Sequence, residues 1–373
     1  MSFSYHTYRE IRQQPQVWQA AYDLLLARKD EIYAFIAKCL SEGYRVVLTG
    51  AGTSAYIGDA LEPALNDSLF KGARSVATTD ILTAPSNYFS PGDKVLLVSF
   101  ARSGNSPESV GAVKAVEATA GSVAHIFITC NAEGQLAQMK GPRILTLLLP
   151  PETNDVSLAM TSSYSTMLIT CAIIAHINRI EEQKEYISAI SGCVQAAMDK
   201  YESQIQAMAA HNFKRAVFLG SGPLKGVAEE SRLKLQELTD GAVMCAFDSF
   251  LGFRHGPKAV VNEETLMVYL LAPDAAVQRY ELDLIRQIKA GIAIDSSILV
   301  CSRRPESLEA DACDLTIETG LPEGLPKCYV CVSYIFVAQL LGCFKSIDCG
   351  LSPDAPSVSG KISRVVEGVT LYI

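Results

Sequence analysis

A short apolar segment that ends in a glycine turn occurs twice in this chain, and this repetition limits the possible fold more than any other feature. The first copy reads RVVLTGAG over residues 45–52, and the second reads RAVFLGSG over residues 215–222, 170 positions later. A buried strand followed by a Gly-x-Gly turn typically opens a parallel α/β unit, because glycine lets the chain turn sharply into a helix. The two copies therefore predict an internal duplication of one α/β unit, for which 373 residues are sufficient.

Alternating strand and helix patterns follow each copy and predict two doubly wound, flavodoxin-like parallel sheets. Expected strands begin at residue 45 and cover 75–79, 94–100, 124–130 and 144–149; in the second half they begin at 215 and cover 241–247, 264–272, 298–301 and 315–318. Expected helices cover 8–40, 163–180, 181–211, 229–237, 276–292 and 326–345, and residues 369–373 are strand-like. The predicted domains are a helical leader (1–40), a first α/β domain (41–195), a second (212–350) and a tail (351–373).

Composition excludes several classes of function. A net charge of −8 without basic runs argues against nucleic acid or an anionic membrane surface as the partner. The longest apolar run, Cys331–Cys343, is too short to span a bilayer and predicts a buried core helix. Eleven cysteines in mostly apolar surroundings indicate reduced thiols and a cytoplasmic protein. Cys328 and Cys331 form a lone CxxC, interpreted as core packing, and no residue cluster predicts a metal site or a cofactor.

The sequence ARSGNSPES, directly after the expected strand 94–100, could bind an anion. Ser103 and Ser106 lie at a turn, and Pro107 stands where a helix would begin. A helix start offers unpaired N–H groups and a partial positive charge, and hydroxyls add donors, so a phosphate would fit. The simpler interpretation is a serine N-cap without a ligand.

A similar turn earlier in the chain favours the phosphate. Gly52 is followed by Thr53 and Ser54 at an expected helix start. A dinucleotide site would need an acidic residue about twenty positions later, and Asp67 and Asp80 straddle that position. A sugar phosphate is therefore favoured over a dinucleotide. The corresponding turn of the second half has no Gly-Thr-Ser, which predicts that only the first half binds phosphate.

Two candidates for proton transfer lie in the second half. Glu230, Lys234 and Glu237 share one face of an expected helix. That face is either a solvated salt-bridging surface or a half-buried site in which a carboxylate serves as a general base. His255 lies in a loop beside Gly-Pro, and its near-neutral pKa would suit proton transfer to a ring oxygen.

Together these motifs resemble the sugar isomerase (SIS) domain family in tandem, over nearly the whole chain. The leader EIRQQP (10–15) is similar to that of the isomerase half of glucosamine-6-phosphate synthase. ARSGNSPES, AMTSSY (159–164) and DAPSVSG (354–360) resemble the AgaS branch, the galactosamine-6-phosphate deaminase/isomerases, also called tagatose-6-phosphate ketose/aldose isomerases.

The resemblance implies roles for particular residues. Phosphate would be bound by the first glycine turn and the serine loop, that is by Gly52, Thr53, Ser54, Ser103 and Ser106. Glu237 would move a proton between C1 and C2, and His255 would assist ring opening, reaching the cleft of a neighbouring subunit in a homodimer or larger oligomer. Arg102 stands after Ala101, where the family has a serine, and would add charge to the phosphate site; Lys361 lies near a family tail lysine.

The implied reaction converts galactosamine 6-phosphate to a ketose phosphate and ammonia, without a metal or redox cofactor. Isomerisation of tagatose 6-phosphate without deamination is the alternative within the same chemistry. A sugar-phosphate sensor that binds without turnover is an alternative of another class. The presence of both Glu237 and His255 favours an enzyme.

Overall fold

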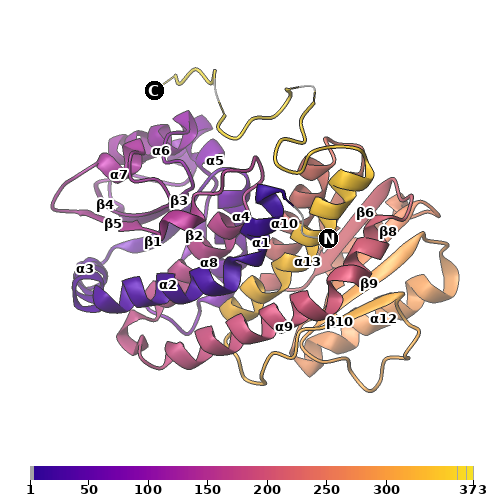
Figure 1. Ribbon diagram of the computed structural model, residues 1–373. Coiled ribbons are helices and arrows are strands. Elements are labelled where there is room, and N and C mark those ends of the chain that lie inside the picture. Colours follow the sequence, from indigo (N-terminus) through magenta and orange to yellow (C-terminus); the bar gives the residue numbers. More distant parts are fainter. Residues whose placement is uncertain (1–3, 359, 367, 373) are drawn as a thin grey trace. The chain divides into compact units, whose positions relative to one another are not determined.

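The computed structural model describes residues 4–358, 360–366 and 368–372, and its contacts divide the chain into two compact units (Figure 1). The first-sheet unit comprises Gln16–Asp155, Met160–Ile187 and the chain from Ile362 on. The second-sheet unit comprises the chain up to Pro15, Val156–Ala159 and Ser188–Lys361. The boundaries of the four predicted segments remain a prediction.

The first-sheet unit holds five parallel strands in the order β2-β1-β3-β4-β5. They are β1 (Arg45–Thr49), β2 (Arg74–Ser75), β3 (Lys94–Ala101), β4 (Ser122–Thr129) and β5 (Ile144–Leu148). The helices are α2 (Gln14–Ala27, which begins in the other unit), α3 (Lys29–Ser41), α4 (Thr53–Leu61), α5 (Thr78–Thr83), α6 (Pro107–Thr119), α7 (Gln135–Gln138) and α8 (Ser162–Ala175). The two central strands are buried on both faces, as parallel strands between two helical layers must be.

The second-sheet unit repeats this design. Its strands are β6 (Arg215–Gly220), β7 (Met244–Asp248), β8 (Thr265–Leu270), β9 (Ser296–Cys301) and β10 (Leu315–Glu318), in the order β10-β9-β8-β6-β7. The helices are α1 (His6–Arg12), α9 (Gln183–Ala209, which begins in the other unit), α10 (Pro223–Leu238), α11 (Phe250–Phe253), α12 (Ala275–Gly291) and α13 (Lys327–Asp348). In chain order both sheets read 2-1-3-4-5, so the predicted pair of flavodoxin-like sheets is confirmed.

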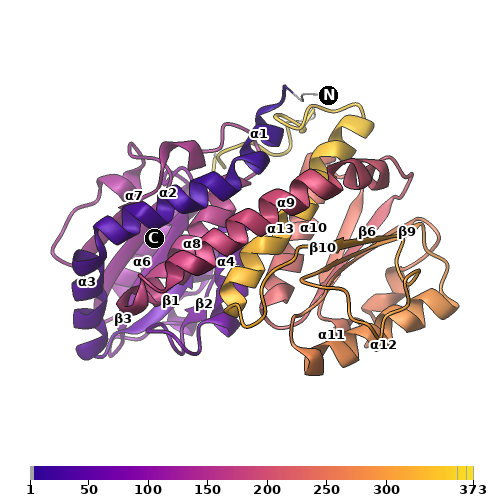
Figure 2. The ribbon, with the colours of Figure 1, turned by 60° about the horizontal axis from the view of Figure 1, so that its bottom comes forward.

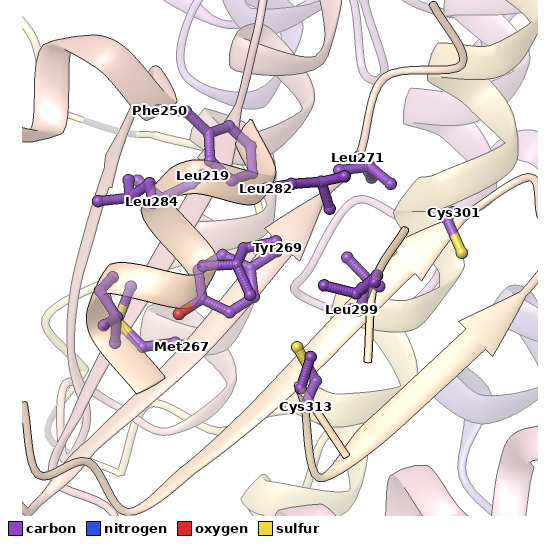
Figure 3. Close-up of a cluster of buried hydrophobic side chains, with 14 of the residues drawn as sticks. Leu219, Phe250, Met267, Tyr269, Leu271, Leu282, Leu284, Leu299, Cys301 and Cys313 are labelled. Atoms are coloured by element: carbon purple, nitrogen blue, oxygen red, sulfur yellow. The ribbon is translucent and has the colours of Figure 1, made fainter. Parts of the chain in front are cut away.

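The second sheet is covered on both faces, with α10 and α13 on one and α11 and α12 on the other (Figure 2). Alternate residues of β6, β8 and β9 point toward α12, as the two-residue repeat of a strand requires. Figure 3 shows the resulting core, in which Tyr269 and Leu299 pack near Leu282 and Phe250. Burial of these side chains on one face fixes the register of the sheet.

Four expected elements differ from the structure. The helix expected at 8–40 is three helices, and the first break precedes Pro15, which lacks the N–H that a helix interior needs. The strand at 75–79 is limited to Arg74–Ser75, because α5 begins at Thr78. No strand forms over 369–372, which is largely exposed and has no strand beside it among the described residues; Ile373 lies outside them.

The fourth difference concerns α13, which is longer than the apolar run that predicted it. By length and composition alone this helix could cross a membrane, yet 94% of its most apolar window is buried inside the structure. The predicted core helix is thus confirmed, including the packing of Cys328 and Cys331 inside it.

Candidate active site

The neighbouring strands β1 and β3 mark the point where the first sheet reverses its winding direction. Ligands of doubly wound sheets bind in the crevice at the carboxyl ends of such strands, which we call the switch point. The glycine turn at Gly50–Gly52 follows β1, and the serine loop, Arg102–Ser106, follows β3. Because β1 and β3 pair in parallel, both predicted phosphate-binding segments lie at one edge of the sheet.

The glycine turn brings the backbone unusually close to the start of α4. A Cβ on Gly50 would lie 2.5 Å from the carbonyl carbon of Ser54, so no larger residue fits there. Gly52 has φ 53° and ψ −127°, a conformation essentially restricted to glycine. The helix begins at Thr53, and the side chains of Thr53 and Ser54 are buried.

The serine loop is held by its own hydroxyls. Ser106 is the N-cap of α6, with its Oγ 3.4 Å from the backbone N of Ser109, and it also donates to Ser109 Oγ at 2.6 Å. Ser103 Oγ accepts from the backbone N–H of Asn105 at 3.2 Å. The predicted N-cap is therefore confirmed. Because a serine hydroxyl has one proton, Ser106 could donate to a phosphate only by giving up its hydrogen bond to Ser109 Oγ.

A second loop, the turn that follows β4, supports the serine loop. Asn131 Nδ2 donates to the carbonyl of Ser103 at 3.0 Å, and Asn105 Oδ1 accepts from the backbone N–H of Gln135 at 3.0 Å. A Cβ on Gly134 would lie 2.4 Å from the Ser103 carbonyl oxygen. The position of the serine loop thus depends on this neighbouring turn, which follows β4.

Arg102 is buried, and its Nη2 donates to the backbone carbonyl of Arg364 at 2.7 Å. Arg364 in turn donates through Nε to the carbonyl of Asp155 at 2.9 Å and through Nη2 to Asn154 Oδ1 at 2.9 Å. Two guanidinium groups therefore join the serine loop, the tail and the loop before α8. The role of Arg364 was not predicted, since nothing around it in the sequence marks it.

Asp155 organises the start of α8 and was also missed. This buried carboxylate accepts from the backbone N–H groups of Thr161 at 2.8 Å and Ser163 at 2.9 Å. It also accepts from the hydroxyls of Ser162 and Ser163, each at 2.5 Å. The AMTSSY motif therefore forms a capped helix start, and its serine hydroxyls point to this internal acceptor.

The helix face with Glu230, Lys234 and Glu237 is buried, so its interpretation as a solvated surface is wrong. Lys234 Nζ lies 2.7 Å from Glu237 Oε2 and 3.4 Å from Glu230 Oε1. The side chains of Lys234 and Glu230 are fully buried, whereas that of Glu237 is 23% exposed. The cause is the close packing of α13 on α10, where a Cβ on Gly342 would lie 3.2 Å from the Lys234 carbonyl oxygen.

The other predicted residues of the second half are exposed. His255 lies in the turn after α11, where its backbone N–H donates to the Gly252 carbonyl at 3.0 Å. Lys361 is also exposed. Within residues 4–358, 360–366 and 368–372, no hydrogen bond or ion pair joins His255 to Glu237, and no group of three His, Cys, Asp or Glu is arranged to hold a metal ion.

Comparison with known proteins places this arrangement in a defined group. The SIS domain family matches residues 40–177. The D-galactosamine-6-phosphate deaminase AgaS of Shewanella sp. is 36% identical, over 99% of this chain and 92% of the relative. The solved tagatose-6-phosphate ketose/aldose isomerase of Escherichia coli has a TM-score of 0.89 and 33% identity, covering 99% and 97% of the two chains. A solved structure from Clostridium novyi has a TM-score of 0.95, also at 33% identity, covering 99% and 95%.

Proposed function

The chain belongs to the SIS-domain family, in its AgaS branch, and from this premise we propose that it converts galactosamine 6-phosphate to tagatose 6-phosphate and ammonia. At a coarser level, the chain is an enzyme, an isomerase or deaminase of sugar phosphates. None of the eleven cysteines, all of which lie within the described residues, forms a disulfide, as we expect of a cytoplasmic protein.

The serine loop and the glycine turn bind the phosphate in this proposal. Ser103 and Ser106 supply hydroxyl donors, and the starts of α4 and α6 supply backbone N–H groups. Thr53 and Ser54 contribute from the first turn of α4. Arg102 is the first residue of this loop and adds a positive charge to the phosphate site, while its Nη2 hydrogen bond ties that site to the tail.

The carboxylate of Glu237 moves the proton, and its pairing with buried Lys234 is the observation that carries the proposal. A general base needs access to its substrate together with a fixed orientation. Glu237 meets both needs, because it is partly exposed and its Oε2 is held 2.7 Å from Lys234 Nζ. Glu230, on the far side of Lys234, holds that ammonium group in place.

The chemistry balances without an outside reactant other than water. Ring opening exposes the C1 aldehyde, and Glu237 removes the C2 proton. Returning a proton to C1 converts the resulting enolamine to a C1 alcohol with an imine at C2. Water adds to this imine and ammonia leaves, which gives the 2-ketose phosphate.

His255 assists ring opening by proton transfer at the ring oxygen. Its exposure on a turn, together with the lack of a hydrogen bond to Glu237 within the described residues, supports a role in the cleft of a second copy. The functional assembly would then be a homodimer or a larger oligomer, with Lys361 in the tail as an additional contact to the sugar phosphate.

Ammonia release from purified protein tests the proposal directly. We expect ammonia from galactosamine 6-phosphate, with glucosamine 6-phosphate measured in parallel, and a loss of about 100-fold or more in kcat for Glu237→Gln. Glu229→Gln is the matched control, because Glu229 lies on the same helix with a side chain 21% exposed. Exchange of the C2 proton with D2O should be lost in Glu237→Gln alone. Full deamination by that variant would contradict the role of Glu237.

The structural likeness to a tagatose-6-phosphate ketose/aldose isomerase favours one second candidate, isomerisation without deamination. That reaction uses the same proton transfer and has no imine. If the protein interconverts aldose and ketose phosphates but releases no ammonia from either amino sugar, the isomerase activity is favoured over the deaminase activity.

Mixing two inactive variants tests the placement of His255. If each cleft uses Glu237 of one subunit and His255 of the other, a dimer of Glu237→Gln with His255→Ala contains one intact cleft. Random reassociation should then restore about a quarter of native activity. No recovery after verified subunit exchange would show that both groups act from the same subunit.

A further inference from the structure

The second sheet has its own switch point, between β6 and β8, and its backbone repeats that of the first. Gly222 has φ 55° and ψ −126°, nearly the values of Gly52, and each glycine is the N-cap of the helix that follows. A Cβ on Gly220 would lie 2.2 Å from the Leu224 carbonyl oxygen, the same kind of close approach as at Gly50. The duplicated chain has therefore kept the shape of a phosphate-binding turn.

The side chains around this turn differ from those of the first half. Pro223 and Leu224 stand where the first turn has Thr53 and Ser54, so two hydroxyls and one backbone N–H are absent. The start of α12 is capped by the carboxylate of Asp274, which accepts from the backbone N–H of Ala276 at 2.8 Å.

A second carboxylate, that of Glu281 on α12, lies inside the switch point. Its side chain is fully buried, and its Oε2 accepts from the backbone N–H of Ala272 at 2.9 Å. In each sheet, the residue before the glycine turn pairs with a residue on the neighbouring central strand. Arg102 in the first half and Ala272 in the second each lie three residues beyond that paired residue, so they occupy equivalent positions. The Glu281 carboxylate thus accepts a hydrogen bond from Ala272, the residue equivalent to the first residue of the serine loop.

The Glu281 carboxyl group is enclosed and only partly satisfied by hydrogen bonds. Its Oε1 has no hydrogen-bond partner in the described part of the chain. Burial raises the pKa of Glu281 to about 7, although the nearby Ser221 hydroxyl and the Ala272 amide act to lower it. Ser221 belongs to the glycine turn itself, so the carboxylate lies near both loops of the switch point.

We propose that the buried carboxyl group of Glu281 occupies the position where a small oxyanion such as phosphate would otherwise bind, and that it keeps the second switch point closed to phosphate. The proposal rests on the proposed function only in taking the first switch point as the phosphate site. It predicts that the second half retains a latent oxyanion site, with Ser221, the Ala272 amide and the start of α10 as its donors.

Counting bound inorganic phosphate by calorimetry tests this proposal. We expect one phosphate per native chain and two per chain of Glu281→Ser, which removes the carboxylate and supplies a hydroxyl. Glu281→Gln is the matched control, because the amide keeps the space filled, and it should bind one. Adding Ser106→Asp to Glu281→Ser should return the count to one.

The outcomes separate this inference from the proposed function. A native chain that binds none, together with a Glu281→Ser chain that binds one, would refute the first site and support the second. A folded Glu281→Ser variant with native stoichiometry would overturn the inference. If that variant does not fold, a phosphate-soaked crystal of the native protein decides the matter: phosphate beside Ser221 would contradict the closure, and phosphate confined to the serine loop would support it.

Discussion

The two switch points share a backbone and differ in chemistry. At the first, glycine-flanked turns present serine and threonine hydroxyls, which donate hydrogen bonds to anions. At the second, the same turn faces the buried carboxylate of Glu281, which can only accept while it is ionised. The two halves thus share a backbone shape, and in our proposals the side chains decide whether an external phosphate or the Glu281 side chain occupies the switch point.

The helix caps beside the two sites show the same contrast. Ser106 caps α6 with a hydroxyl, and Asp274 caps α12 with a carboxylate. Both are good N-caps, so helix stability does not distinguish them. A carboxylate cap, however, already places negative charge at the helix start, where the first half would hold phosphate.

The largest effect is expected when the first site is made like the second. Ser106→Asp should retain the cap of α6 but place a negative charge in the serine loop, raising KM for the sugar phosphate about 100-fold. Steady-state kinetics and phosphate binding measure this effect. Ser106→Thr keeps the hydroxyl and should remain near native KM; equal loss in both variants would mean that packing, and not charge, controls the site.

A smaller effect should appear in the pH dependence of stability. The pKa of Glu281 is raised from 4.5 to about 7 in the folded chain, so the folded state binds this proton more tightly. Its contribution to the free energy of unfolding is full below about pH 4.5 and is lost as pH rises through 7. From pH 5.5 to 7.5 the native protein should lose about 2 kcal/mol relative to Glu281→Gln.

Denaturant unfolding of both proteins across that range tests the sign as well as the size. Asp283→Asn on the same helix is the control, since its side chain is 70% exposed. Parallel pH curves for native and Glu281→Gln would show that Glu281 ionises normally in the folded state.

The smallest effect concerns the two N-cap glycines. Gly52→Ala and Gly222→Ala should each cost about 1–2 kcal/mol of stability, because both positions have positive φ. Only Gly52→Ala should also weaken phosphate binding. Denaturant unfolding and phosphate binding are measured on both variants. If Gly222→Ala weakened phosphate binding as much as Gly52→Ala, the proposed difference between the two switch points would be wrong.

Local patterns in the sequence were sufficient for the fold and for the local geometry of the glycine turn and the serine loop. Apolar runs such as Val95–Val98 mark buried strands, and Ser106-Pro107 marks a helix start, because these signals lie within a few residues. The duplicated glycine turn predicted the repeated topology. The charge face of α10 was ambiguous, since its burial depends on α13, a helix about a hundred positions away.

The remaining features depend on distant contacts that leave no local signal. Arg364 and Asp155 are 209 positions apart, and neither has a neighbour in sequence that indicates a partner. Glu281 has the spacing of an ordinary helical residue, and its burial also depends on the packing of α12 against the sheet, which brings it near Ser221 of the distant glycine turn. Side-chain burial, which decides all three, is a property of the assembled unit.

The packing of α1 on α13 has a consequence for the synthesis of the chain. Gln14 Nε2 donates to Gln339 Oε1 at 2.8 Å, and the backbone N–H of Thr7 donates to Asp354 Oδ1 at 2.8 Å. These partners are 325 and 347 positions apart, so the early segment can form these hydrogen bonds only after every strand of the second sheet has been translated. During that interval α1 is exposed without its packing partner and is a target for chaperones. A premature stop codon shortly before α13 would leave α1 permanently without that partner.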